Sequence, residues 1–580
     1  MRAVTESAPD APSSRRRLEP WASLALVLLS ASLAVHHLSG DAATADEPVH
    51  LAAAVEVVRE GTGRWNPEHP PLAKAIAGLA LSGLPLRPAE DPLRSPAGPG
   101  RLLRFLYANE TPGETVLFRA RLPFVALLVA LLLAVRSEAR RRWGGWAGCA
   151  ALGFAALEPN LLAHAGVVHT DLAATLFVVL SLGPLARLAR PEARRAPLVL
   201  GLLWGLALLS KYSAPLLALA TLPFLAADAT PSPSDVPRLL RRLEAATAIA
   251  LVVALAGFAW AHRNQTPEDR RALTTERLET KGRSAAAARL AIRAGDALPP
   301  LGNLLTGALS VVLQSEVGAG VNYFCGRVSR EGSPFYFPLA LAVKTPLGLL
   351  LGLGAALAAR DGRRFAGALG AGLALFLLLS ARTTYNIGVR HALFLFPLAA
   401  IAAGAALAGD GRRQGPGPAL FGGGSRLRQR VALSGLVVLG LELAAVHPHE
   451  LSFFNALAGG PQGGRRLFAD SNLDWGQELL RLKEAAPAFA PSGLGTVVFG
   501  GDLPSRHAPA LRPPLPGEEE RPGALLAIGE APLALGPELL RAKGAVGDAE
   551  RLERIRAAVR KRGTRVGSIG ASIGIWRLDR

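Results

Sequence analysis

The sequence predicts an α-helical polytopic membrane protein of about eleven transmembrane helices, with a small α/β domain outside the membrane at its C-terminal end. Half of the 580 residues are hydrophobic and 19% are charged, and the mean hydropathy is +0.28. Such a chain is too apolar for a soluble protein and too long for one compact core. Apolar runs separated by short arginine-rich segments continue to residue 446, which indicates repeated crossing of a bilayer.

Ten apolar runs approach the roughly 20 residues that a helix needs to cross a bilayer. The run at 196–227 is long for one helix and is interrupted by Ser210, Lys211 and Tyr212. We interpret it as a helical hairpin that turns at Lys211. The other runs are 21–39, 116–135, 145–164, 171–186, 244–261, 336–358, 365–381, 391–408 and 431–446.

Arginine-rich segments predict the orientation of these runs, because short basic loops stay on the cytoplasmic side. All of them fall on one side only if 196–227 is a hairpin, which gives 11 spans and an outer C-terminus. The net charge of +19 is therefore a topology signal, and no nucleic-acid partner is predicted. The basic segments are the N-terminus, 136–142, 187–195, 238–242, 360–364 and 410–430.

The domain boundaries follow from this topology. Residues 1–19 are expected to be a disordered cytoplasmic N-terminus, and 20–446 a membrane domain with outer loops 40–115 and 262–335. Residues 447–580 are expected to form the outer α/β domain. Its predicted elements are a helical stretch from 470, strands at 495–501, 524–530 and 566–576, and a helix at 548–562.

Lysine is scarce in this chain, with seven lysines among 64 basic residues. The preference for arginine, with abundant alanine and glycine, is typical of a GC-rich bacterial genome, so we expect a bacterial plasma membrane protein. Three of the lysines, Lys74, Lys211 and Lys344, stand in or beside apolar segments. The two cysteines imply no disulfide framework.

Unusual polar residues gather at the predicted outer ends of the spans. Because ionisable groups at membrane depth usually line a functional cavity, we expect a site on the outer face. The first outer loop supplies Asp46, Glu47, His50, Glu68, His69 and Lys74; later segments supply His169, Asp171, Lys211, Asn386, Arg390 and His391.

Each of these residues taken singly has a simpler explanation. Asp46, Glu47 or Asp171 could cap a helix, and His69 with Pro70 and Pro71 could be a rigid turn back into the membrane. Their combination is less easily explained by capping.

Adjacent carboxylates and cations at a membrane surface suit the transfer of a group from an anionic lipid carrier. A carboxylate can deprotonate an acceptor hydroxyl, and Lys or Arg can stabilise a departing phosphate. The prolines of "HPPLAK" at 69–74 would aim Lys74 at the membrane surface. The outer segments contain no closely spaced metal-ligand pattern, so no metal site or other cofactor is assigned and metal dependence stays open.

Together these motifs resemble the phospholipid-carrier-dependent glycosyltransferases of the GT-C fold, in the group of protein O-mannosyltransferases (family 39) and aminoarabinose transferases. The resemblance rests on "DEPVHL" (46–51), "HPPLAK" (69–74), "ARLP" (120–123), "EPNLLAHAGVVHTDLA" (158–173), "SKYSAPLL" (210–217), "YFPLALAVKTPLGLLL" (336–351) and "NIGVRH" (386–391). It implies transfer of a sugar, with inversion, from a polyprenyl-phosphate donor.

The resemblance also implies roles for individual residues. Asp46 would be the catalytic base, with Glu47 beside it. The donor phosphate would be bound by Lys74, Arg121, Lys211 and Arg390, and the substrates would be positioned by Glu68, His69, His169, Asp171, Asn386 and His391. The 262–335 loop is too short for the large insertion of the mannosyltransferases, so the acceptor could be a protein, a lipid or a polysaccharide.

Two alternatives stay open at this level. In "DSNLDWGQ" (470–477), either Asp470 or Ser471 caps a helix against which Trp475 packs, or Asp474, Trp475 and Gln477 contact the sugar or acceptor. A transporter or lipid-binding scaffold is the rival to an enzyme. Such a protein more often shows mid-span polar residues and internal repeats, which this sequence lacks.

Overall fold

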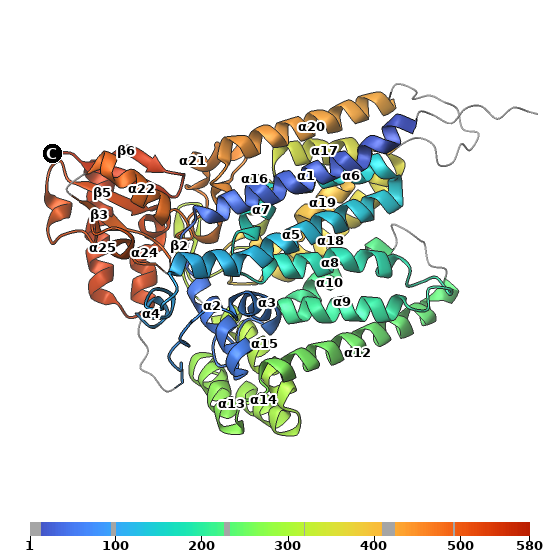
Figure 1. Ribbon diagram of the computed structural model, residues 1–580, viewed down its shortest axis with the longest axis horizontal. Coiled ribbons are helices and arrows are strands. Elements are labelled where there is room, and N and C mark those ends of the chain that lie inside the picture. Colours follow the sequence, from blue (N-terminus) through green and yellow to red (C-terminus); the bar gives the residue numbers. More distant parts are fainter. Residues whose placement is uncertain are drawn as a thin grey trace, which may run out of the picture.

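The computed structural model describes residues 13–93, 100–225, 233–317, 320–408, 424–490, 493–500 and 502–580. A bundle of helices forms most of the molecule, and a smaller domain that contains a β-sheet packs against one end of it (Figure 1). The predicted fold class, a helical membrane protein with a small C-terminal α/β domain, is confirmed.

Within the described residues, five helices are long and apolar enough to cross a membrane. They are α1 (Ser13–Ser39), α5 (Gly113–Trp143), α12 (Val236–Ala261), α18 (Arg360–Ser380) and α20 (Gly424–Val446). A sixth span arises if α16 (Tyr336–Lys344) and α17 (Leu347–Leu357), bent by 95°, are counted as one.

The other helices of the bundle are shorter, so the count of 11 spans stays a prediction. They are α6 (Gly145–Ala156), α7 (Pro159–Ala165), α8 (Asp171–Ala186), α9 (Ala196–Ser210), α10 (Ala214–Thr221) and α19 (Leu395–Gly404).

Helices α9 and α12 pack side by side and run in the same direction. Gly201 of α9 lies against Ala246 of α12. One turn further along, Gly205 lies against Ala250. Because α9 and α12 are parallel, the chain that joins them, which contains α10, must return along the bundle. This is the return that a hairpin at Lys211 requires.

We expect thiol labelling of intact cells to report the sidedness of this arrangement. In a Cys325→Ser background, Arg140→Cys and Leu240→Cys should resist a membrane-impermeant maleimide, because both lie at predicted inner ends of helices. Arg87→Cys and Lys543→Cys should react, since both side chains are exposed at the other end of the molecule. Labelling of Leu240→Cys without labelling of Arg140→Cys would contradict the hairpin.

The two predicted outer loops are largely helical. The first contains α2 (Glu47–Val55), the π-helix η1 (Glu56–Glu60), α3 (Pro71–Leu81) and α4 (Gly100–Tyr107). The second contains α13 (Pro267–Thr274), η3 (Thr275–Lys281), α14 (Ala285–Ala297), α15 (Pro299–Val317) and a hairpin of β1 (Asn322–Phe324) and β2 (Arg327–Ser329).

The C-terminal domain has a five-stranded sheet with the order β4-β3-β5-β7-β6. β3 pairs in parallel with β4 and β5, whereas β7 is antiparallel to β5 and β6. The strands are β3 (Leu494–Val497), β4 (Leu511–Arg512), β5 (Leu525–Gly529), β6 (Gly563–Ile569) and β7 (Ile573–Leu578); the helices are α22 (Leu479–Phe489), α23 (Pro504–His507), α24 (Glu530–Ala542) and α25 (Val546–Arg562).

Some boundaries differ from the sequence-based expectation. α1 begins at Ser13, so part of the tail expected at 1–19 is helical, while residues 1–12 lie outside the described residues. The inner loop expected at 410–430 also lies mostly outside them. The helical stretch expected from 470 starts with the single 3-10 turn η8 (Asp470–Asn472), and its α-helix begins only at Leu479.

Candidate active site

Five segments bring most of the predicted polar residues to the end of the bundle nearest the C-terminal domain. Each lies at a helix end, where the chain turns between α1 and α2, before α3, between α7 and α8, between α9 and α10, and before α19. The residues brought together are Asp46, His50, His69, His169, Asp171, Lys211, Arg390 and His391.

Asp46 is the acid of this group whose side chain is partly exposed to solvent. It occupies the N-cap position of α2, but its side chain makes no capping hydrogen bond. Its Oδ2 atom lies 3.3 Å from Nη1 of Arg390 and 3.8 Å from Nε2 of His169, and 38% of the side chain is exposed. The capping explanation therefore does not account for this acid.

Glu47 is a fully buried partner of Arg121. Its two oxygens lie 2.6 and 2.8 Å from the guanidinium and also accept from the backbone N–H groups of Thr44 and Val168. Burial alone would raise the pKa of Glu47, but Arg121 and these hydrogen bonds outweigh it and hold the pKa below its usual value.

The guanidinium of Arg121 is already hydrogen-bonded within the protein. Besides Glu47, its guanidinium donates to the backbone carbonyls of Leu38, Asp41 and Ala42, and only 1% of the residue is exposed. The pair thus joins the end of α1 to the start of α2.

We expect Glu47→Gln to destabilise the protein strongly, because it leaves a buried guanidinium without its counter-charge. Such a loss costs about 3–5 kcal/mol. The temperature at which the detergent-purified protein aggregates should fall clearly. Glu110→Gln is a matched control, since Glu110 pairs with Arg87 with both side chains mostly exposed, and such pairs contribute at most about 1 kcal/mol. Equal effects of the two substitutions would contradict this role of Glu47.

His169 lies at the centre of an ionic chain. Its Nδ1 atom lies 2.5 Å from Asp171 Oδ2, and its Nε2 atom lies 2.8 Å from Arg390 Nη1. Asp171 also pairs with Lys211, whose ammonium lies 3.2 Å from Nδ1 of His391. Asp171 is thus the counter-ion that links the start of α8 to the α9–α10 turn.

Three imidazoles from separate segments meet at this point. The ring centroids of His50, His69 and His169 lie 4.7, 4.9 and 5.5 Å apart, and one nitrogen from each lies within 4.8 Å of the others. Burial and the neighbouring cations hold the pKa of His50 and His69 well below its usual value, so these rings are neutral. The three histidines come from separate segments of the chain, so no spacing within one segment predicts this cluster.

Hydrogen bonds decide which nitrogens of the cluster are free. The Asn66 amide nitrogen donates to His50 Nδ1 at 3.3 Å, and its oxygen accepts from His69 Nδ1 at 2.9 Å. His50 therefore carries its proton on Nε2, and Arg390 occupies the lone pair of His169. Among these three ligand candidates only His69 keeps a free lone pair, so a metal ion would require a change of tautomer and displacement of Arg390.

Three buried N–H donors of the site have no hydrogen-bond partner among the described residues. They are Nε of Arg390, Nε2 of His50 and Nε2 of His391. His391 carries its proton on Nε2, because the ammonium of Lys211 can only donate to Nδ1. Unpaired buried donors are costly, and three of them beside two cations favour an anionic ligand.

The segment "NPEHPPLAK" (66–74) has a different role for each polar side chain. Glu68 pairs with Arg277 of η3 at 3.0 Å, and His69 joins the imidazole cluster. Pro71 begins α3, where the missing N–H of proline costs nothing. Lys74 is buried and donates to the carbonyls of Asn66 and Trp65 at 2.6 and 3.3 Å.

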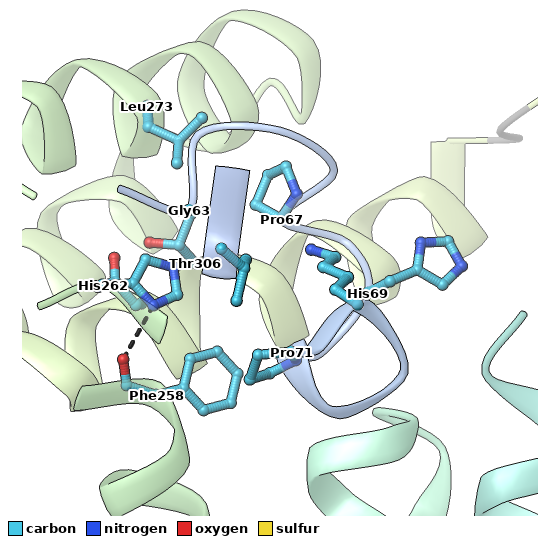
Figure 2. Close-up of a pocket in the computed structure, with 11 residues that line it drawn as sticks. Gly63, Pro67, His69, Pro71, Phe258, His262, Leu273 and Thr306 are labelled. Carbon is cyan, nitrogen blue, oxygen red and sulfur yellow. Dashed lines mark hydrogen bonds between the residues drawn. The ribbon is translucent and has the colours of Figure 1, made fainter. Parts of the chain in front are cut away.

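Figure 2 shows the small pocket beside this segment, into which Pro67, Pro71 and Thr306 project. His262 binds the carbonyl of Phe258 there. The cavity is about 10 Å³, roughly the space for one water molecule. This pocket is too small for a substrate. Lys74 instead holds the loop before α3 in place through its bonds to the carbonyls of Trp65 and Asn66.

The segment 470–477 connects the site to the C-terminal domain. α22 begins at Leu479 with Glu478 as its N-cap, so the expectation that Asp470 or Ser471 caps this helix is wrong. Trp475 is 1% exposed, and its ring lies 4.3 Å from the Arg390 guanidinium carbon and 5.6 Å from the His169 ring.

Asp474 is directed away from the site. Its Oδ2 atom accepts from the backbone N–H of Ala531 at the start of α24, and burial raises its pKa to about 7. Asn386 lies near the site in the loop before η4 (Val389–Ala392), where it contacts Asn322 and Ser333.

Residues 113–262 match the family described as dolichyl-phosphate-mannose-protein mannosyltransferase. The match includes Arg121, His169, Asp171 and Lys211, whereas Asp46 and Arg390 lie outside it. No curated protein matches the chain. The resemblance to these glycosyltransferases that the sequence motifs predicted is confirmed by the family match.

Three solved structures are similar to this chain over different parts of its length. The S. cerevisiae protein O-mannosyltransferase Pmt1-Pmt2 complex bound to the sugar donor is 17% identical, with a TM-score of 0.34. The alignment covers 43% of this chain and 34% of that chain. ArnT from Cupriavidus metallidurans bound to undecaprenyl phosphate is 14% identical, with a TM-score of 0.31 and 98% of each chain covered. The oligosaccharyltransferase AglB from Archaeoglobus fulgidus, in complex with an inhibitory peptide and a dolichol-phosphate, is 13% identical, with a TM-score of 0.43. The alignment covers 75% of this chain and 56% of that chain.

Proposed function

We propose that the protein transfers a sugar, with inversion, from a polyprenyl-phosphate donor to a hydroxyl acceptor on the outer face of a bacterial plasma membrane. The observation that carries the proposal is the partly exposed carboxylate of Asp46 next to three buried N–H donors that lack partners. The description of the matched family, which names a lipid-phosphate sugar, supports the donor class.

Asp46 is the general base of the proposed reaction. Glu47 and Asp171 are buried and committed to ion pairs, whereas Asp46 keeps 38% of its side chain exposed. A general base must reach the proton it removes within about 3 Å. The Asp46 carboxylate accepts the proton of the acceptor hydroxyl as the new bond forms between the acceptor oxygen and the anomeric carbon.

The donor phosphate binds on the other side of the anomeric carbon. Arg390, with its free Nε–H, and the Nε2–H groups of His50 and His391 donate to the phosphate oxygens. As the bond between the anomeric carbon and the phosphate breaks, these donors stabilise the charge on the departing lipid phosphate. Attack opposite to the leaving group inverts the anomeric centre.

The remaining candidates act through these groups. We assign Lys211 and Asp171 to the orientation of His391 and His169, and Trp475 to holding the guanidinium of Arg390 by a cation–π contact. Glu47, Arg121, Glu68, Lys74 and Asp474 fix the surrounding backbone.

An assay of the purified protein with a panel of polyprenyl-phosphate sugars tests the proposal. We expect one donor to be consumed, with release of polyprenyl phosphate and transfer of its sugar to an added hydroxyl acceptor. The same sugars linked to nucleotides are the control and should not react. Folded protein that binds no polyprenyl-phosphate sugar of the panel would contradict the proposal.

A further inference from the structure

A cavity of about 560 Å³ lies outside the group of residues assigned to the reaction. Its walls are the β1–β2 hairpin, the segment that follows it and Asn386. Small-molecule sites typically measure about 300–1,000 Å³, so the cavity is large enough for a substrate. None of the proposed donor-binding groups lines it.

The walls of this cavity are fixed by both parts of the molecule. The backbone N–H of Cys325, at the hairpin turn, donates to the carbonyl of Leu467 at 2.9 Å, and Phe324 pairs with Phe468 in an isolated antiparallel bridge. Figure 1 shows β2 where the helical bundle meets the C-terminal domain, and α24 contacts both strands. The hairpin is thus held by hydrogen bonds to the segment that leads to Trp475.

Two buried asparagines form the floor of the cavity. Asn322 donates to the carbonyl of Thr384 at 2.8 Å and accepts from the backbone N–H of Asn386 at 3.2 Å. The Asn386 amide nitrogen donates to the carbonyl of Ser333 at 3.3 Å. Its buried Oδ1 atom has no partner among the described residues. A buried acceptor without a donor is unfavourable, and a hydroxyl group of a ligand would offset this cost.

The floor is connected to the proposed active site through the segment that carries Asn386 and Arg390. Asn386 and Arg390 are four positions apart in the chain, so their Cα atoms are at most about 14 Å apart. The neighbouring Tyr385 has its ring 6.0 Å from that of His391. Burial raises the pKa of Tyr385 to about 12, with Arg390 and Asp46 close enough to influence it.

We infer that this cavity binds the acceptor and that the acceptor is a neutral saccharide. The inference rests on the proposed function. The lining offers the amides of Asn322 and Asn386, the hydroxyls of Ser329 and Ser333, and the Phe324 ring. This mixture of donors and acceptors around an aromatic face suits a ligand rich in hydroxyl groups.

Charge and backbone geometry favour a saccharide over a peptide. Arg327 and Glu331 line the cavity with opposite charges, so no net charge is selected. Peptides commonly bind by adding a strand to an open sheet edge, but β2 has three residues and β1 already bridges to Phe468. The available edge is too short for that mode.

Alkylation of Cys325 tests occupancy without any substitution. Cys325 is exposed and lines the cavity, whereas Cys149, the other cysteine, is buried. In the purified protein, millimolar maltotriose should slow the reaction of Cys325 with a maleimide several-fold, and a neutral peptide that contains Ser and Thr should not. Protection by the peptide alone, or by neither probe, would overturn the saccharide inference.

A substitution that fills the cavity tests this inference separately from the proposed function. Ser329→Trp should lower sugar transfer to saccharide acceptors by about tenfold or more and leave polyprenyl-phosphate binding unchanged. Arg330→Trp is the control, because Arg330 is exposed on the same segment but does not line the cavity. Normal transfer by Ser329→Trp would overturn the inference, whereas absence of donor binding in the unsubstituted protein would instead contradict the proposed function.

Discussion

Asp46→Asn should lower turnover by about 10²-fold or more, the usual scale for the loss of a general base. The amide keeps the shape of the carboxylate and can still accept from Arg390, which lies 3.3 Å away, but it cannot take the proton of the acceptor. Donor binding should therefore persist. Initial rates with a saturating polyprenyl-phosphate sugar, together with binding of a fluorescent polyprenyl phosphate, measure the two effects separately.

Asp296→Asn is a matched control for this substitution. Asp296 also contacts an arginine, with its Oδ1 atom 3.2 Å from Arg270, and its side chain is 39% exposed, but it lies in α14, away from the imidazole cluster. It should turn over normally. Near-normal turnover by Asp46→Asn would refute the assignment and leave Glu68 and Asp171 as the acids to be tested next.

Arg390→Ala should abolish most transfer and also weaken donor binding. The guanidinium touches Asp46 and His169 and stacks on Trp475, and its Nε–H is the free donor proposed to contact the phosphate. Removing one donor of a developing anion typically costs about 10²–10³-fold in turnover. We expect a loss of this size in kcat and a weaker affinity for polyprenyl phosphate.

Two further variants separate the role of charge from that of geometry. Arg390→Lys keeps the charge but loses the planar fork and its stacking, so its activity should fall between those of Arg390→Ala and the unsubstituted protein. Arg565→Ala removes a similar contact between arginine and tryptophan in the C-terminal domain and should not affect donor binding. Unchanged donor affinity in Arg390→Ala would remove Arg390 from the proposed phosphate site.

The helical membrane fold with a small C-terminal α/β domain could be predicted from the sequence, and the site remains a prediction. Apolar run lengths and arginine-rich loops are local properties, since bilayer thickness and the membrane potential act on each segment separately. The same holds for two of the C-terminal strands, since the stretches predicted at 495–501 and 524–530 overlap β3 and β5. The single strand predicted at 566–576 is wrong, because the chain turns within it and forms the antiparallel pair β6 and β7. The motifs that carry the family resemblance are also local.

The partners of the polar residues could be decided only by the tertiary structure. Asp46 and Glu47 are adjacent and chemically alike. Glu47 is buried in an ion pair with Arg121, which lies 74 positions away in the sequence, whereas the Asp46 side chain is partly exposed. Asn66 was not among the candidates predicted from the sequence, and it becomes important because its amide contacts both His50 and His69. Nothing in "DSNLDWGQ" shows that Trp475 contacts Arg390. Burial and pairing depend on packing between distant segments, which a local pattern does not encode.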